Sequence, residues 1–454
     1  MSIQTINPAT GEALETYEET SPRELEQILA RAHAMFLEWR LVPFAERARR
    51  MRKAAEILRT RQTQYARTMT LEMGKPIVQA EAEVDKCAAV CDYYAEHAES
   101  FLARQPRETE ASSSSVRFDP LGPVLAVMPW NFPFWQVFRF AAPALMAGNA
   151  GILKHASNVP GCALAIEQVF RDAGFPPGIF SSVLIPASTV AGLLGDPRVV
   201  AATLTGSERA GSTVAEHAGR HLKKTVLELG GSDPFIVLSD AEVAAAARTA
   251  ADARLINSGQ SCIAAKRFIV VESLADQFIE RFRDELQGRR MGDPLARETQ
   301  VGPQARADLR DSLHQQVEES VKRGAKRLLG GEIPAGKGAF YPPTLLAAVD
   351  KGMPAFDEET FGPVAAVTRA KDEADAVRLA NDSPYGLGAS VWTRDRACAE
   401  RVAAQIEAGC VFVNGLVKSD PRMPFGGIKR SGYGRELSEY GIREFVNIKS
   451  VWIV

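Results

Sequence analysis

The chain has 454 residues, of which 46% are hydrophobic and 24% charged, a composition typical of a globular protein with two or three domains. The formal net charge is −2, which argues against a broad basic surface for nucleic acid or an anionic membrane. We find neither an apolar run of the roughly 20 residues that span a bilayer nor a secretory signal at residues 1–8. Six cysteines over this length indicate no disulfide framework, so we expect a cytoplasmic protein.

The first hundred residues are predicted to be mainly helical. Residues 21–24 form a capping box with proline at the first helical position, and further helices are expected over 45–73 and 78–101. The last of these places Cys87 and Cys91 on one face. Cysteines four residues apart can bind a metal, but no further Cys or His completes a site, so we predict that they pack in the core and that the protein has no metal.

From residue 104 the pattern changes. Residues 104–119 are polar and carry a serine tract, which fits a pair of exposed strands or a flexible arm. Beyond residue 121, short apolar runs alternate with helices, which predicts an α/β fold with parallel sheets and crossover helices. The tail at 449–454 is expected to be a last strand that could pair with the arm. The predicted strands are 124–128, 152–153, 183–185, 201–204, 226–227, 235–238, 268–271, 364–368, 389–392 and 411–413.

Cys262 stands in a glycine-containing loop, residues 257–263, between an alanine-rich helical run and a short apolar strand. Backbone N–H groups in such a loop can lower the pKa of a thiol and bind an oxyanion. Upstream lies Glu228, a lone carboxylate between leucines and a Gly-Gly turn. A nucleophile and a carboxylate base are a minimal set for covalent acyl chemistry, and the alternative is a buried cysteine that serves only as a small apolar residue.

Two further stretches suit a nucleotide. Gly206 and Ser207 follow a predicted strand and open a helix, where N–H groups and the positive helix end can hold a phosphate; the alternative is an ordinary tight turn. Lys154 and Ser157 follow another strand, at the edge where open α/β sheets bind ligands. They could hold ribose oxygens or a 2′-phosphate, or the lysine could simply be solvated.

The densest aromatic stretch, residues 128–139, contains Asn131 and Arg139. Asn131 lies in a proline-flanked loop, and its amide N–H could join a backbone N–H in an oxyanion hole. Arg139 lies among apolar residues and needs an anionic partner, which could be a substrate carboxylate or a structural carboxylate of the protein itself.

Taken together, six ordered motifs closely resemble the signatures of the aldehyde dehydrogenase superfamily, and the resemblance runs from residue 7 to the C-terminus. The motifs are PWNFP at 129–133, LTGS at 204–207, LELGG at 227–231, GQSC at 259–262, ETFGP at 359–363 and PFGGIK at 424–429.

The resemblance implies roles for three residues. Cys262 would be the nucleophile that forms a thiohemiacetal with an aldehyde, and Asn131 with the Cys262 N–H would hold the oxyanion. Hydride transfer to a nicotinamide would leave a thioester, and Glu228 would activate the water that hydrolyses it. A CoA-acylating variant is disfavoured by Glu228, and a non-catalytic binding protein is disfavoured because all three residues are present.

The resemblance also implies a cofactor site. Many members that prefer NAD carry a glutamate at or next to Ser157, which repels a 2′-phosphate, so serine here predicts that NADP is preferred and that NAD is an alternative. The positions that match cofactor contacts, with the two from the strand-to-helix turn, are Trp130, Lys154, Ser157, Gly206, Ser207, Glu359 and Phe361.

By resemblance the chain has three parts and forms a homodimer or homotetramer. We expect a Rossmann-like cofactor-binding domain at 1–103 and 121–228, an α/β catalytic domain at 229–420, and a small β oligomerisation arm at 104–120 and 436–454.

Within the superfamily the chain is most similar to bacterial succinate-semialdehyde dehydrogenases. Trp135, Arg139 and Ser419 are the expected substrate residues, with Arg139 near the substrate carboxylate. Several members carry a second arginine where this chain has Ile256, so other short, medium or aromatic aldehydes remain an alternative substrate class.

Overall fold

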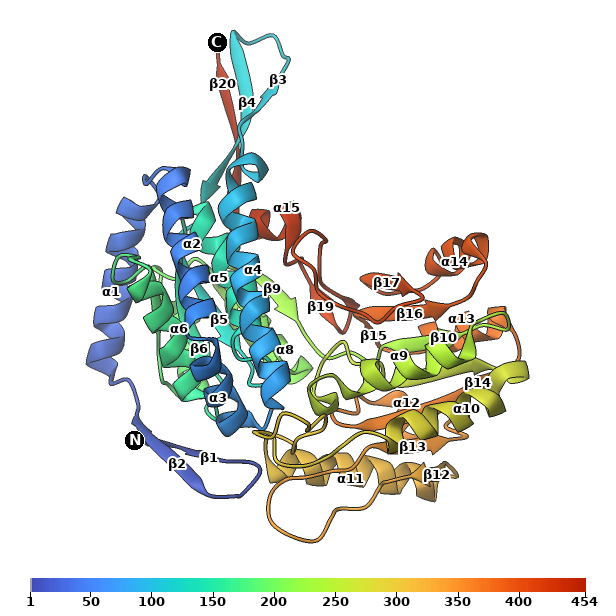
Figure 1. Ribbon diagram of the computed structural model, residues 1–454. Coiled ribbons are helices and arrows are strands. Elements are labelled where there is room, and N and C mark those ends of the chain that lie inside the picture. The colour runs from blue at the N-terminus through green and yellow to red at the C-terminus, as the bar shows by residue number, and fades with distance from the viewer. Residues whose placement is uncertain (1) are drawn as a thin grey trace.

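The computed structural model describes residues 2–454 and has two α/β parts with a β arm that projects from one of them (Figure 1). The first part begins with a hairpin and helices that pack beside its sheet. In chain order these elements are β1 (Ser2–Ile6), β2 (Ala13–Glu18), α1 (Pro22–Trp39), α2 (Phe44–Thr60), α3 (Gln62–Met73) and α4 (Ile77–Phe101).

The sheet of the first part has six strands in the order β19-β9-β8-β5-β6-β7. It is parallel except for β19, which pairs antiparallel with β9. Helix α5 is buried along its whole length, because α4 covers it. The elements are β5 (Pro123–Met128), α5 (Trp135–Ala147), β6 (Ala150–His155), α6 (Pro160–Asp172), β7 (Phe180–Ser182), η1 (Ala187–Thr189), α7 (Val190–Gly195), β8 (Ala201–Thr205), α8 (Glu208–Arg220), β9 (Lys224–Glu228) and β19 (Gly432–Tyr433).

The second part holds a seven-stranded sheet in the order β12-β13-β14-β11-β10-β16-β17. Its strands alternate between two cores: Phe235 and Val237 face one apolar cluster, and Ile236 faces the other. The elements are β10 (Pro234–Val237), α9 (Val243–Leu255), η2 (Ile256–Gly259), β11 (Arg267–Val271), α10 (Glu272–Gln287), α11 (Ala307–Lys322), β12 (Lys326–Leu329), β13 (Thr344–Ala347), α12 (Pro354–Asp357), β14 (Val364–Ala370), α13 (Glu373–Asn381), β15 (Tyr385–Gly386), β16 (Gly388–Trp392), α14 (Arg396–Ala403), β17 (Cys410–Val413) and β18 (Ile428–Lys429).

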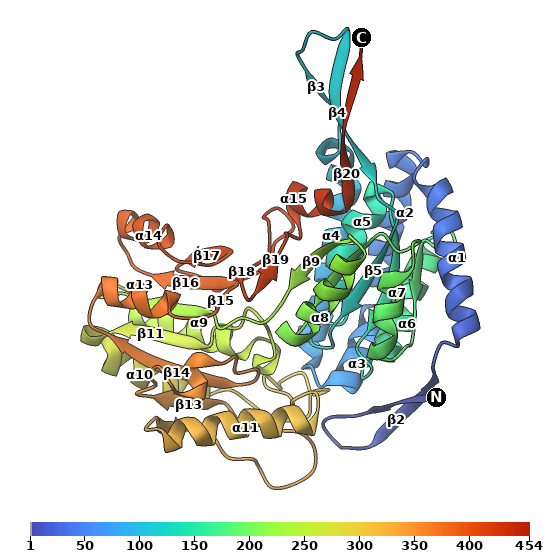
Figure 2. The same cartoon turned by 180° about the vertical axis from the view of Figure 1, so that it is seen from behind.

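The arm is a three-stranded antiparallel sheet in which the C-terminal strand lies beside β4. Figure 2 shows it extending away from the body, with the C-terminus at its tip. The register runs from Val446 opposite Pro120 to Ile453 opposite Ser113. The elements are β3 (Gln105–Arg107), β4 (Ser113–Pro120), α15 (Ser438–Ile442), η3 (Arg443–Phe445) and β20 (Val446–Ile453).

The α/β prediction is confirmed, with local corrections. The expected strand at 183–185 is wrong: β7 lies at Phe180–Ser182, where two serines hide the apolar pattern. Strands β12 and β13 were not predicted, and β12 is mostly exposed and begins with two basic residues. Cys87 and Cys91 are buried in α4, and residues 2–454 contain no cluster of metal-binding side chains. None of the helices described is long and apolar enough to cross a membrane.

A buried ion pair joins α5 to the segment just before α15. Arg139 Nε lies 2.6 Å from Glu436 Oε2, and both side chains are almost fully buried. The guanidinium also lies over the ring of Phe425 and donates through Nη2 to Thr205 Oγ1 at 3.3 Å. The structural partner that the sequence left open for Arg139 is therefore present in the fold.

Replacing Arg139 by alanine leaves the Glu436 carboxylate without its cation. We expect Arg139→Ala to lower the free energy of unfolding by about 3 kcal/mol, because an uncompensated buried charge is costly. The matched control is Arg430→Ala, which breaks an exposed pair with Glu208 and should cost less than about 1 kcal/mol. Urea unfolding followed by tryptophan fluorescence measures both variants, and equal losses would contradict the prediction.

Candidate active site

The cysteine loop is held in an unusual backbone conformation just after α9. Asn257 and Ser258 have φ values of 51° and 56°, in the left-handed region, and both are fully buried. The following Gly259 has φ 77°, and a Cβ there would lie 2.3 Å from the backbone of Gly362. Only glycine fits this close approach, because any side chain would collide with the neighbouring chain. The turn thereby fixes the position of the backbone that leads to Cys262.

Asn131 is fixed against this loop by hydrogen bonds to both ends of its side chain. Its Nδ2 donates to the carbonyl of Gln260 at 3.0 Å, and its Oδ1 accepts from Gln136 Nε2 at 3.0 Å. Asn257 Nδ2 donates to the Asn131 carbonyl at 2.6 Å. Because an amide nitrogen has two hydrogens, Asn131 keeps one to donate elsewhere.

The loop that carries Asn131 is anchored from behind by a buried carboxylate. Glu83 Oε1 accepts from the N–H groups of Phe134 and Trp135 at 2.9 Å each, at the start of α5. Glu83 is itself ion-paired with the fully buried Lys75, whose ammonium lies over the ring of Phe132. The negative charge at the N-terminus of α5 also suits the helix dipole. Sequence reasoning missed this pair, because Lys75 before α4 and Glu83 within it lie about 50 residues upstream of the loop they support.

The thiol of Cys262 is less acidic than the sequence suggested. Burial raises its pKa to about 12, and the neighbouring Glu228 carboxylate adds to the increase. The expected lowering fails because burial, with the charge of Glu228, outweighs the opposing charges of Arg139 and Lys266. Within residues 2–454 the Cys262 N–H has no hydrogen-bond partner, so it is free to bind an oxyanion.

Lys266 holds the cysteine loop through its carbonyl groups, a role that the sequence did not predict. Its buried Nζ donates to the carbonyls of Ser261, Cys262 and Ala264 at 3.1, 2.8 and 3.1 Å. It also lies 3.5 Å from Glu359 Oε1, which accepts from the N–H of Gly231 at 3.0 Å. One ammonium thus connects the cysteine loop with the expected cofactor residue Glu359.

Glu228, at the end of β9, is buried and only partly hydrogen-bonded. Its Oε1 accepts from Gly427 N–H at 3.2 Å, and its Oε2 has no partner within residues 2–454. Burial raises the pKa of this carboxyl to about 8, against the opposing effect of Arg139. The carboxyl has the raised pKa and the unpaired oxygen that suit a proton acceptor working near neutral pH.

One cavity of about 260 Å³ brings together the thiol and most of the expected cofactor residues. The Trp130 and Phe361 rings meet edge to face there, with centroids 5.8 Å apart. Ser207 caps α8 by accepting from the Ala210 N–H. The predicted residues that line this cavity are Cys262, Asn131, Trp130, Gly206, Ser207, Glu359 and Phe361.

The other predicted cofactor residues lie outside that lining. Lys154 stands at the end of β6 and is largely buried, and the same burial lowers its pKa. Ser157 is exposed and borders a separate hollow of about 630 Å³, shared with Arg306 and Arg310. His155, between them, was not predicted to matter; its Nε2 hydrogen-bonds the Pro133 carbonyl at 2.9 Å and ties the Asn131 loop to β6.

The expected substrate residues form a second group beside α5. Trp135 Nε1 donates to Ser419 Oγ at 3.1 Å, so these two residues are in contact. Arg139 lies one helical turn beyond Trp135, and its charge acts on both Cys262 and Glu228. None of the three lines the 260 Å³ cavity itself.

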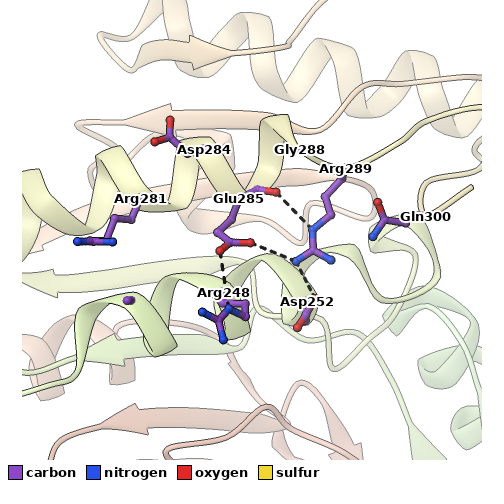
Figure 3. Close-up of a pocket in the computed structure, with 9 residues that line it drawn as sticks. Arg248, Asp252, Arg281, Asp284, Glu285, Gly288, Arg289 and Gln300 are labelled. Carbon is purple, nitrogen blue, oxygen red and sulfur yellow. Dashed lines mark hydrogen bonds and ion pairs between the residues drawn. The ribbon is translucent and has the colours of Figure 1, made fainter. Parts of the chain in front are cut away.

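A larger hollow, of about 600 Å³, lies between α9 and α10 and contains none of the predicted site residues (Figure 3). Its charges are balanced within the hollow: Arg289 pairs with Asp252 at 2.8 Å, and Arg248 approaches Glu285 at 3.8 Å. Volume alone does not make it a site, because it offers neither a nucleophile nor a buried polar group without a partner.

Comparison with known proteins agrees with this geometry. The model of the aldehyde dehydrogenase family matches residues 1–451. A protein of Synechocystis sp., named probable succinate-semialdehyde dehydrogenase (NADP(+)), is 53% identical over 100% of both chains, and succinate-semialdehyde dehydrogenase (NADP(+)) 1 of Mycobacterium tuberculosis is 51% identical over 100% of both. The crystal structure of succinic semialdehyde dehydrogenase from Streptococcus pyogenes in complex with NADP+ superposes with a TM-score of 0.97, at 40% identity over 99% of both chains. The chain therefore belongs to the aldehyde dehydrogenase family.

Proposed function

We propose that this protein oxidises succinate semialdehyde to succinate with NADP+ as the cofactor. The observation that carries the proposal is the single cavity that holds Cys262, Asn131 and the expected nicotinamide-side residues. Relatives that cover the whole chain at 51–53% identity bear names with this activity, which supports the choice of substrate and cofactor.

In the proposed reaction Cys262 is the nucleophile. Its Sγ attacks the aldehyde carbon, and the oxygen of the resulting thiohemiacetal is held by Asn131 Nδ2 and the Cys262 N–H. Burial and the charge of Glu228 raise the pKa of the thiol, so its proton leaves to solvent as the carbon–sulfur bond forms. Loss of one oxyanion donor typically costs roughly 10²–10³ in rate.

The residues present fit a dinucleotide. Lys154 is a largely buried ammonium with no ion-pair partner within residues 2–454, and such a group favours an anionic or polyhydroxylated ligand. Ser207 and Gly206 offer the start of α8 to a phosphate, and Glu359 with Phe361 would hold the nicotinamide riboside. The cofactor, when bound, supplies a hydride acceptor. The protein holds the cofactor in place and excludes water.

Release of the product falls to Glu228. Hydrolysis of the Cys262 thioester needs a base to take a proton from water, and only the ionised carboxylate can do so. Because its pKa is about 8, the ionised fraction grows as the pH rises through that value. We expect deacylation to become faster as the pH rises through about 8 and to level off above it.

We also propose that the three parts divide the work as the sequence suggested. The six-stranded part would hold the cofactor, the seven-stranded part the nucleophile, and the arm would join subunits into a homo-oligomer. The exposed apolar side chains of β20 support the last point: Ile448, Trp452 and Ile453 are 62%, 51% and 52% exposed. Apolar groups so exposed on one strand are typical of an interface.

A second substrate class has one observation in its favour. The Arg139 guanidinium is engaged by Glu436, so it is a weaker anchor for a substrate carboxylate than a free arginine would be. An enzyme without a carboxylate anchor would favour uncharged aldehydes, and the aromatic rings of Trp135 and Phe132 would suit them.

Initial rates of NADPH formation distinguish the two classes. We expect kcat/KM for succinate semialdehyde to exceed that for butyraldehyde by roughly 100-fold, because charge-assisted hydrogen bonds to the carboxylate add to binding. Equal values for the two aldehydes would refute the proposed substrate and favour the uncharged class, while the family assignment would stand.

Cofactor choice is tested at Ser157. We expect wild type to prefer NADP+ in kcat/KM, and Ser157→Glu to shift the ratio toward NAD+ by roughly tenfold or more, because a carboxylate repels the 2′-phosphate. Ser157→Gln is the matched control, since it adds the same bulk without the charge and should shift the ratio much less. A wild-type preference for NAD+ of tenfold would contradict the prediction.

A further inference from the structure

A lysine that sequence analysis did not single out contacts both Trp135 and Ser419. Lys86 lies on α4, on the side that faces α5, and its Nζ donates to Ser419 Oγ at 2.7 Å. The same ammonium lies 4.1 Å from the centroid of the Trp135 ring. Trp135 Nε1 in turn donates to Ser419 Oγ at 3.1 Å, so each of the three side chains contacts the other two.

Every charged neighbour of Lys86 is already engaged. Arg139 is paired with Glu436 at 2.6 Å, and Glu83 is paired with Lys75. Asp420, the residue after Ser419, is held by Arg422 through two hydrogen bonds at 2.7 and 2.8 Å. Within residues 2–454, Lys86 has a hydroxyl and an aromatic ring as partners but no carboxylate at ion-pair distance.

Without a ligand, this arrangement costs the protein free energy. A partly buried ammonium loses hydration, and this burial, with the repulsion of Arg139, lowers the pKa of Lys86 to about 8. Cys87, Glu83 and Asp420 favour the charged form but do not pair with it. A partly buried cation whose hydrogen-bonding capacity is not filled is a candidate for ligand binding rather than for stability.

We propose that Lys86 is the residue that binds the distal carboxylate of the substrate, with the Ser419 hydroxyl beside it and the Trp135 ring as the wall. The inference rests on the proposed function, since it requires an aldehyde that carries a carboxylate. On this proposal, specificity for short oxo-carboxylates comes from α4, although no residue of α4 lines the cavity that contains the Cys262 thiol.

The geometry also explains why Arg139 is not needed as the direct contact. Arg139 lies one turn beyond Trp135 on α5 and is held by Glu436 and Thr205. Its charge reaches Lys86, Cys262 and Glu228 from that fixed place. Lys86, which has three N–H donors and uses one on Ser419, keeps donors for an incoming carboxylate.

The test is the ratio of kcat/KM for succinate semialdehyde to that for butyraldehyde. We expect Lys86→Met to reduce this ratio roughly 10–100-fold, mainly through KM for the charged aldehyde, because a charge-assisted hydrogen bond is lost. Lys86→Arg, which keeps the charge, should retain most of the ratio. Lys53→Met, a lysine-to-methionine change at an exposed position of α2, is the matched control and should leave the ratio unchanged.

A second readout separates binding from packing. Competitive inhibition by succinate should weaken in Lys86→Met and in Lys86→Gln by a factor similar to the loss of the ratio. The glutamine variant keeps a hydrogen-bond donor for Ser419, so it serves if the methionine variant folds poorly. A merely structural lysine would change the thermal midpoint without changing the inhibition constant for succinate.

The outcomes are distinct. If wild type prefers succinate semialdehyde and both neutral variants keep the preference and the inhibition constant, Lys86 is not the anchor and the proposed function stands. If wild type shows no preference at all, the proposed substrate fails, and the role of Lys86 fails with it.

Discussion

The active site depends on hydrogen bonds that cross between the two sheets. Asn131 follows β5 of the six-stranded sheet, and the turn at Asn257–Gln260 follows α9 of the seven-stranded part. Two hydrogen bonds between them hold Asn131 beside the cysteine loop. The left-handed backbone of Asn257 and Ser258 is strained and persists because buried neighbours determine it. The same bonds therefore fix the fold at its junction and the chemistry that the junction performs.

Charges around this junction are mostly buried in pairs. Lys75 with Glu83 orients the start of α5, Arg139 with Glu436 ties α5 to the C-terminal segment, and Lys266 links the cysteine loop to Glu359. Each pair is shielded from solvent and holds a loop or segment in place. Glu228 Oε2 has no partner within residues 2–454, and Lys86 has a hydroxyl and an aromatic ring but no carboxylate as partners. We propose that the first binds a proton and the second a substrate carboxylate. This division between paired and unpaired charges follows from the high free energy of an isolated buried ion.

Sequence reasoning predicted the alternation of strands and helices, the buried faces and the cysteine loop, because local periodicity and short motifs around Cys262 and Glu228 indicate them. It could not predict which side chains meet across long separations, such as Lys86 with Ser419 or Arg139 with Glu436, since periodicity shows that a residue is buried and not what it contacts. It also misjudged the acidity of Cys262, which depends on burial and on the charge of Glu228. The short strand β7 was displaced for a related reason, because two serines interrupt its apolar run.

The central claim is that Cys262 carries the acyl group and that Glu228 releases it. The direct measurement is the mass of proteolytic peptides from the Glu228→Gln variant, quenched after incubation with succinate semialdehyde and NADP+. The account predicts a burst of NADPH close to one per subunit and a succinyl group on the peptide that contains Cys262, because acylation proceeds and the base for hydrolysis is gone. An unmodified Cys262 peptide after such a burst, or a succinyl group on another of the six cysteines, would contradict it.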